Sequence, residues 1–137
     1  MIVIDASVVN KLVLSHEEGH DQAIKLFKNH IAAKVEIFIP DLLFYEVANT
    51  LATKAKISNW KMTNSLTKLY QMGLNIYYPT EIDIKVAARL AKSYHTSVYD
   101  MVYVVIAKRH KTTFITADRK FAELTNFKST KLLSDLK

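Results

Sequence analysis

Four acidic residues, Asp5, Glu46, Asp100 and Asp118, occupy positions where a carboxylate needs an explanation. Asp5 and Asp118 each follow a short apolar run and precede a helical pattern, whereas Glu46 and Asp100 lie in mostly apolar helical segments. Neither Glu46 nor Asp100 has a lysine or arginine three or four positions further along with which to pair. Converging carboxylates repel one another unless a cation lies between them. All-oxygen ligation favours Mg²⁺ or Mn²⁺, and such a site supports phosphodiester hydrolysis by a metal-activated water.

Each acid also has an ordinary local interpretation. Asp5 and Asp118 are well placed to cap the helices that follow them, and Ser97 with Asp100 has the spacing of a capping box. Glu46 fits a solvated helix face equally well. Local capping explains a tolerated acid at each position, but it does not explain four acids gathered at one place.

Apolar strands alternate with helical patterns along the whole chain. The expected strands are 1–5, 36–40, 74–79 and 112–116, with a weaker one in 128–133, and the expected helices are 7–14, 20–33, 41–56, 59–73, 80–95, 96–110 and 117–124. Asn59 is the expected N-cap of its helix, and Thr80 with Asp83 has capping-box spacing. The alternation predicts one domain over residues 1–137, a three-layer α/β/α sandwich with a mostly parallel central sheet. Functional groups of such sheets gather at the carboxyl ends of the strands.

Composition excludes several classes of protein. The 137 residues include two glycines, so neither a phosphate-binding P-loop nor a dinucleotide-binding glycine motif can be formed. The absence of cysteine excludes thiolate zinc sites and cysteine nucleophiles. No basic leader or long apolar run is present, so we expect a cytoplasmic protein with no membrane segment. The formal charge of +6 permits a polyanionic partner such as nucleic acid.

The sequence HEEGH at 16–20 matches the zinc-protease motif H-E-x-x-H, in which His16 and His20 would bind zinc and Glu17 would act as the base. That motif requires a stable helix. Gly19 lies inside it, and the flanking residues provide no apolar face, so a loop between two helices is the better interpretation. The zinc protease remains a remote alternative.

Four motifs, in order and over essentially the full length, resemble the PIN domain family, and in particular its VapC type, the ribonuclease toxins of type II toxin–antitoxin pairs. MIVIDASV resembles the family's opening motif, IPDLLFYEVANTL its second, SVYDMVYVVIA its third and FITADRKF its closing motif. The visible departure is Met101, where the family usually has alanine. This larger side chain removes no expected ligand.

The resemblance implies a role for each motif residue. The expected acidic cluster that holds Mg²⁺ or Mn²⁺ consists of Asp5, Glu46, Asp100 and Asp118, with Asp5 and Asp100 as the strongest candidates for direct ligands. The residues expected to orient these carboxylates by hydrogen bonds are Ser7, Asn49 and Thr116. The implied activity is endonucleolytic hydrolysis of RNA, leaving a 5′-phosphate and a 3′-hydroxyl. The implied partners are a small antitoxin protein that covers the acidic pocket and a second copy of the chain in a homodimer.

Basic residues flank the motif-bearing segments and are candidates for contacts with an RNA backbone. They are Lys11, Lys108, Arg109, Lys111, Arg119 and Lys120. For any single one of them, an ordinary solvated charge at a helix end is the better interpretation. A second function from a different class also stays open, a non-catalytic RNA-binding or scaffold module with the same fold.

Overall fold

The computed structural model describes residues 1–14 and 16–137, in which five strands and seven α-helices alternate as the sequence predicts. Ser15, within the predicted loop, lies outside the described residues. The strands are β1 (Ile2–Ile4), β2 (Ile37–Pro40), β3 (Asn75–Tyr77), β4 (Thr113–Thr116) and β5 (Thr130–Leu132). The helices are α1 (Ala6–Val13), α2 (His20–Ile31), α3 (Leu42–Thr53), α4 (Asn59–Gln71), α5 (Glu81–Tyr94), α6 (Val98–Arg109) and α7 (Arg119–Thr125), followed by a 3₁₀ turn at Leu133–Asp135.

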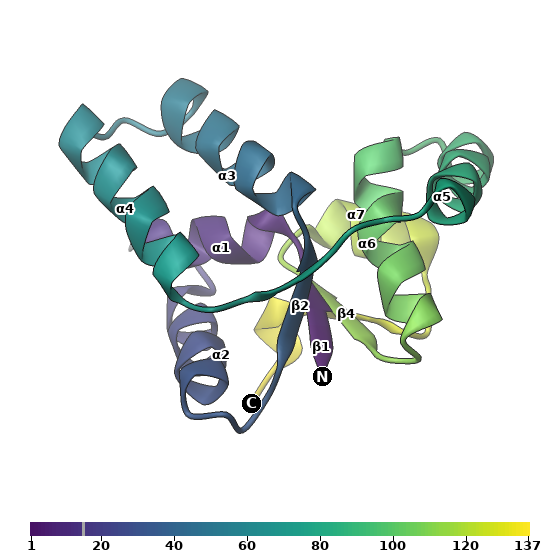
Figure 1. Ribbon diagram of the computed structural model, residues 1–137, viewed down its shortest axis with the longest axis horizontal. Helices are drawn as coiled ribbons and strands as arrows, with labels where there is room; N and C mark the ends of the chain where they lie inside the picture. Colours follow the sequence, from purple (N-terminus) through teal and green to yellow (C-terminus); the bar gives the residue numbers. More distant parts are fainter. Residues whose placement is uncertain (15) are drawn as a thin grey trace.

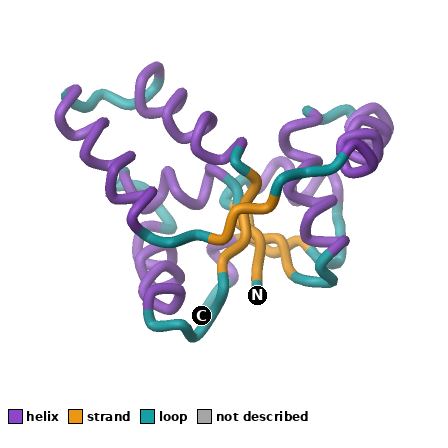
Figure 2. The backbone as a smooth tube through the Cα atoms, in the orientation of Figure 1, coloured by secondary structure: helices purple, strands orange, loops and turns teal. Residues whose placement is uncertain are grey.

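The strands form one sheet in the order β3-β2-β1-β4-β5, and every neighbouring pair is parallel. β1 lies at the centre, where Ile2 is in register with Ile37 of β2 and Thr113 of β4. Helices α1 to α4 cover one face of this sheet and α5 to α7 the other (Figure 1), and the backbone tube shows the strands crossing between the two helical layers (Figure 2). The predicted α/β sandwich is confirmed, with a sheet that is wholly parallel.

Helix α6 is the most deeply buried helix segment on its face of the sheet. Every residue from Met101 to Ala107 is buried, and the helix contacts β1, β2 and β4 on one side and α5 on the other. A helix enclosed on both sides is apolar around its circumference, which explains why Asp100 is conspicuous at its first turn. The burial of α6 fixes the position of Asp100 relative to the central strands.

Two helix starts show how capping sets the boundaries. Thr80 and Asp83 form the predicted capping box at the start of α5. The expected N-cap of α4, Asn59, is wrong: the cap is Ser58, whose hydroxyl accepts a hydrogen bond from the Lys61 amide at 3.1 Å. Ser58 has the extended backbone that a capping residue requires, and serine is as good a cap as asparagine.

The HEEGH segment is a turn rather than a helix. Residues 16–19 form turns and a bend, Gly19 has a φ of +93°, and α2 begins only at His20. The Nδ1 atom of His20 lies 2.9 Å from the carbonyl oxygen of Lys11, so this ring is engaged with the backbone of α1. The zinc-protease alternative is therefore contradicted, because the helix that would place both histidines on one face is missing from the described residues. Among residues 1–14 and 16–137, no helix is long and apolar enough to cross a membrane.

Candidate active site

The four predicted acids lie at the carboxyl edge of the sheet. Asp5 directly follows β1, and Asp118 follows β4 by two residues. Glu46 lies in the second turn of α3, the helix that leaves β2, and Asp100 lies in the first turn of α6. Because β1, β2 and β4 are parallel neighbours, their carboxyl ends bring segments far apart in sequence to one rim.

Asp5 is held by residues from α1 and β4. Its carboxylate accepts hydrogen bonds from the Ser7 hydroxyl and from the Thr116 hydroxyl, the latter at 2.5 Å, and from the Val8 amide at 3.3 Å. The Val8 contact is the predicted cap of α1, so Asp5 caps a helix and also faces the rim. These three bonds fix the orientation of the carboxylate before any ligand arrives.

The same hydroxyls fasten the loop between β4 and α7. The Ala117 amide donates to Ser7 Oγ at 2.8 Å, and the Asp118 amide donates to Thr116 Oγ1 at 3.0 Å. Asp118 in turn caps α7 by accepting from the Phe121 amide at 2.9 Å. Ser7 and Thr116 therefore tie Asp5 and Asp118 into one hydrogen-bond network.

Ser97 caps α6 as predicted, but the capping box is incomplete, because the Asp100 carboxylate bonds to the Ser97 hydroxyl and not to the Ser97 backbone amide. The Ser97 hydroxyl donates to Asp100 Oδ2 at 2.8 Å, while Ser97 Oγ accepts from the Asp100 amide at 3.1 Å. Asp100 is half-buried and keeps its other carboxylate oxygen available. The capping interpretation thus holds together with a position at the rim.

Glu46 is the least satisfied of the four. Its Oε1 is buried without a hydrogen-bond partner in the described structure, and the same is true of the Tyr103 hydroxyl. That hydroxyl, on α6, lies beside the Glu46 carboxyl, and burial raises the pKa of Tyr103 far above its ordinary value. Tyr103 therefore stays protonated and is available as a donor to Glu46. Tyr103 lies within the third motif, SVYDMVYVVIA, but the sequence gave no indication of this contact.

The acids act on one another electrostatically. Burial, reinforced by the charge of Asp100, raises the pKa of Asp5 from 3.8 to about 6 despite its three hydrogen bonds. Burial and the charges of Asp100 and Asp5 raise the pKa of Glu46 from 4.5 to about 7. Burial and the charge of Asp118 also raise the pKa of Asp100. Within residues 1–14 and 16–137, no lysine, arginine or histidine forms an ion pair with any of the four.

This donor set fits a hard divalent cation. The ligands on offer are carboxylate oxygens, one of them buried and unpartnered, and a cation would remove the repulsion that raises their pKa values. In the positions described, no three acidic or histidine side chains stand at the spacing of ligands to one ion. Binding a cation therefore requires the carboxylates to move together, which side chains at a half-buried rim can do by rotamer changes.

Asn49, predicted to orient the acids, lies one turn beyond Glu46 on α3 and is exposed. Among the described residues its side chain makes no hydrogen bond to any of the four carboxylates. Met101, by contrast, is fully buried beneath Asp100, so it affects packing of the core rather than the open rim.

The predicted basic residues separate into two groups. Lys108, Arg109 and Lys111 lie at the far end of α6, and Thr112 beside them bonds to the Met1 carbonyl at the opposite edge of the sheet. The Arg109 Nε atom pairs with buried Asp83 at 3.1 Å, and Lys108 Nζ stacks 5.0 Å above the Phe127 ring. The structure does not bring these three to the acidic rim.

Lys11, Arg119 and Lys120 lie closer to the acids. Lys11 is on α1, which begins directly after Asp5, and Arg119 and Lys120 follow Asp118. The Lys11 Nζ atom pairs with Glu17 at 2.6 Å. Of the six predicted basic residues, these three are therefore the ones that lie near the acidic rim.

A wholly parallel α/β sandwich with carboxylates at the carboxyl ends of its central strands defines the class of protein, and comparisons identify the family. The family model of the PIN domain matches residues 2–126. Ribonuclease VapC3 of Pyrobaculum aerophilum is 31% identical over 127 residues, covering 89% of this chain and 92% of its own length. The chain therefore belongs to the PIN domain family, and the resemblance seen in its four motifs is confirmed.

Solved structures share the fold. The crystal structure of PAE2754 from Pyrobaculum aerophilum superimposes with a TM-score of 0.70 at 21% identity, covering 96% of this chain and 90% of that one. Mycobacterium tuberculosis VapC20, described as a sarcin-ricin loop cleaving toxin, gives 0.70 at 13% identity, covering 90% and 94%. FitAB bound to a DNA fragment gives 0.67 at 16% identity, covering 100% and 98%.

Proposed function

We propose that the protein is a metal-dependent endoribonuclease that acts as the toxin of a toxin–antitoxin pair. The observation that carries the proposal is the rim itself, where four carboxylates from four segments lie without a counter-cation among the described residues. Membership of the PIN domain family and the relative named Ribonuclease VapC3 support the reaction class. The four motifs that resemble VapC-type toxins support the toxin role.

Asp5, Asp100, Glu46 and Asp118 would hold Mg²⁺ or Mn²⁺. When bound, such a cation lowers the pKa of a coordinated water and stabilises negative charge on the phosphodiester. Asp5 is presented in a fixed orientation by Ser7 and Thr116, and Asp100 by Ser97. Glu46, whose pKa is raised to about 7 by burial and by the charges of Asp100 and Asp5, is suited to accept and release a proton near neutral pH.

Partners follow from the family. We propose a cognate antitoxin protein that covers the rim, and a homodimer of the toxin itself. Aromatic side chains exposed around the groove between α3 and α4, namely Tyr45, Tyr70 and Tyr78, supply apolar surface for such contacts. Size-exclusion chromatography with light scattering would measure the oligomeric state directly.

The reaction is tested by metal removal. Purified protein stripped with chelator should leave a labelled single-stranded RNA intact, and excess Mg²⁺ or Mn²⁺ should restore cleavage to 5′-phosphate and 3′-hydroxyl ends. Because the carboxylates alone offer no activated water, we expect the metal-free rate to fall by at least about a hundredfold. Equal cleavage with and without chelator would exclude the metal-dependent mechanism.

The second candidate function is that of a non-catalytic RNA-binding module with the same fold. The observation that favours it is the spacing of the acids, since no three of them in the described structure stand ready to ligate one ion. Such a module would bind RNA in chelator and in Mn²⁺ equally, and it would cleave RNA under neither condition.

A further inference from the structure

A cavity of about 410 Å³ opens directly beside the acidic rim. Its wall is built by α1, by the end of α3 and by the loop between β4 and α7. Two rim residues, Ser7 and Asp118, belong to this wall. The charged side chains of Lys11, Glu17 and Lys54 also line it, together with Thr50. A ligand whose reacting group lies among the four acids would therefore extend into this cavity.

One face of helix α3 runs from the acidic rim to this cavity. Glu46, Thr50 and Lys54 follow one another at intervals of four residues, so their side chains lie in one row. The rise of the helix places Lys54 about 12 Å beyond Glu46 along the axis. Lys54, the C-cap of α3, is held by a bond from its amide to the Thr50 carbonyl at 2.9 Å. Its charge is thus too far away to act on the bond being broken, but close enough to act on a neighbouring part of the same strand.

The two lysines of the cavity differ in their charge balance. Lys11 Nζ is paired with Glu17 Oε2 at 2.6 Å, which offsets its charge. Lys54 has no carboxylate partner among residues 1–14 and 16–137. Lys54 is therefore the uncompensated cation of this cavity, next to a rim that otherwise repels a polyanion.

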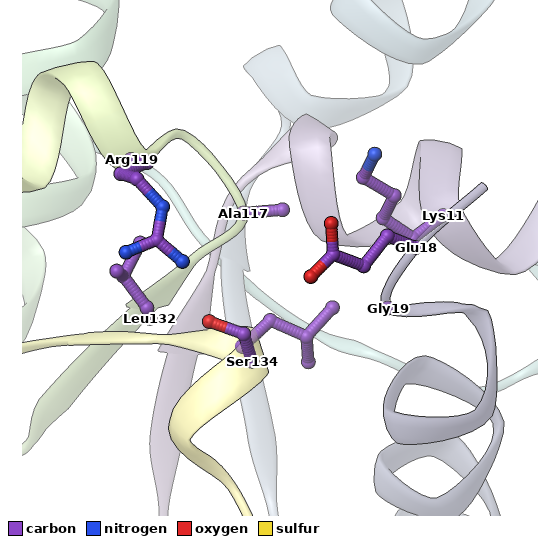
Figure 3. Close-up of a pocket in the computed structure, with 8 residues that line it drawn as sticks. Lys11, Glu18, Gly19, Ala117, Arg119, Leu132 and Ser134 are labelled. Atoms are coloured by element: carbon purple, nitrogen blue, oxygen red, sulfur yellow. The ribbon is translucent and has the colours of Figure 1, made fainter.

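A neighbouring cavity is less suited to a polyanion. It lies on the other side of Lys11 and Ala117, with a volume of about 100 Å³. Figure 3 shows the Glu18 carboxylate and the Arg119 guanidinium reaching into it from opposite sides. Its small volume leaves less room for a phosphate and its neighbouring nucleotides.

We propose that the cavity between α1 and α3 holds the RNA backbone next to the scissile phosphate, with Lys54 as its positioning residue. This inference rests on the proposed function and adds a substrate contact to it. Lys54 binds a phosphate neighbouring the one attacked, so it supports ground state and transition state alike. Glu17 competes with that phosphate for Lys11, and its carboxylate weakens RNA binding at the same place.

The test measures binding and cleavage separately. Fluorescence anisotropy of a labelled single-stranded RNA is recorded in chelator, so no cleavage is needed, for the wild type and for Lys54→Ala, Lys54→Arg, Glu17→Gln and Lys34→Ala. Lys34 is an exposed lysine just before β2, at the opposite edge of the sheet, and serves as the matched control for charge. Cleavage by the same proteins is then measured with Mn²⁺.

We expect Lys54→Ala to weaken RNA binding about five- to tenfold and to reduce the slope of log affinity against log salt by about 1. KM should rise by a similar factor with kcat unchanged, and Lys54→Arg should restore both. Glu17→Gln should tighten binding. If Lys54→Ala binds RNA as tightly as Lys34→Ala does, the inference is overturned. A cavity that binds a protein partner and not RNA would give this result. If the wild type does not cleave RNA with Mn²⁺, the proposed function is overturned. The anisotropy comparison of Lys54→Ala with Lys34→Ala would still decide whether the cavity binds RNA.

Discussion

Replacing Asp100 by asparagine is expected to lower kcat/KM for RNA cleavage by at least about a hundredfold, because the rim loses a carboxylate ligand. Asparagine keeps the shape of aspartate and retains an oxygen that can accept the bond from Ser97, which is 2.8 Å long in the wild type. The amide that bonds to Ser97 Oγ at 3.1 Å belongs to the backbone and is unaffected. The cap of α6 therefore survives, and the loss of activity reports on the charge.

The measurement is the initial rate of cleavage of a labelled RNA at several Mn²⁺ concentrations. Asp21→Asn is the matched control, since Asp21 is an exposed acid in the first turn of α2. It should cleave RNA at the wild-type rate. An Asp100→Asn protein that is folded and as active as this control would show that Asp100 does not take part in the reaction.

The stability of the metal-free protein is expected to fall as the pH rises from about 4.5 to 7.5. Asp5 and Glu46 have folded-state pKa values of about 6 and about 7, above the ordinary values of 3.8 and 4.5. In that interval the folded protein binds more protons than the unfolded chain, so unfolding becomes easier with each increase in pH. The displacement of either pKa corresponds to about 3 kcal/mol, and the two effects overlap because the groups interact.

Urea unfolding in chelator at several pH values measures this slope, and Glu46→Gln isolates one contribution to it. Glutamine cannot ionise, so the variant should be more stable than the wild type at pH 7.5 by up to about 3 kcal/mol and similar to it at pH 4.5. Saturating Mn²⁺ should reverse the order at pH 7.5, because the cation stabilises the ionised wild-type rim. A wild type that exceeds Glu46→Gln in stability at high pH without metal would show that the rim carries no electrostatic strain.

The fold could be predicted largely because local sequence signals mark where each helix and strand begins or ends. The short run before Asp5, the proline that ends β2 and the capping pair Thr80 and Asp83 mark boundaries that the structure reproduces. The parallel sheet then places residues that follow strands at one edge, which is why Asp5 and Asp118 were predictable as neighbours. A local signal can also fit two adjacent residues. Both Ser58 and Asn59 are suitable N-caps, so the sequence alone did not show that Ser58 is the residue that caps α4.

The features that the sequence did not predict correctly depend on which residues lie close together in space. Lys108 and Arg109 are close to Asp100 in sequence, but a rise of 1.5 Å per residue carries Arg109 about 14 Å along α6 and onto Asp83. Lys54 is the reverse case, since only the packing of α1 against α3 brings its cavity beside Ser7 and Asp118. The contact of Tyr103 with Glu46 likewise joins two helices that no sequence spacing relates.

The central claim is that the four rim carboxylates hold a divalent cation, and calorimetric titration of Mn²⁺ tests it most directly. The chelator-stripped wild type should bind Mn²⁺ with a saturating heat and at least one ion per chain. The double variant Asp5→Asn, Asp100→Asn should bind none at the concentrations that support cleavage, while remaining folded by circular dichroism. Equal Mn²⁺ binding by the two proteins, or none by the wild type, would contradict the assignment of the rim as a metal site.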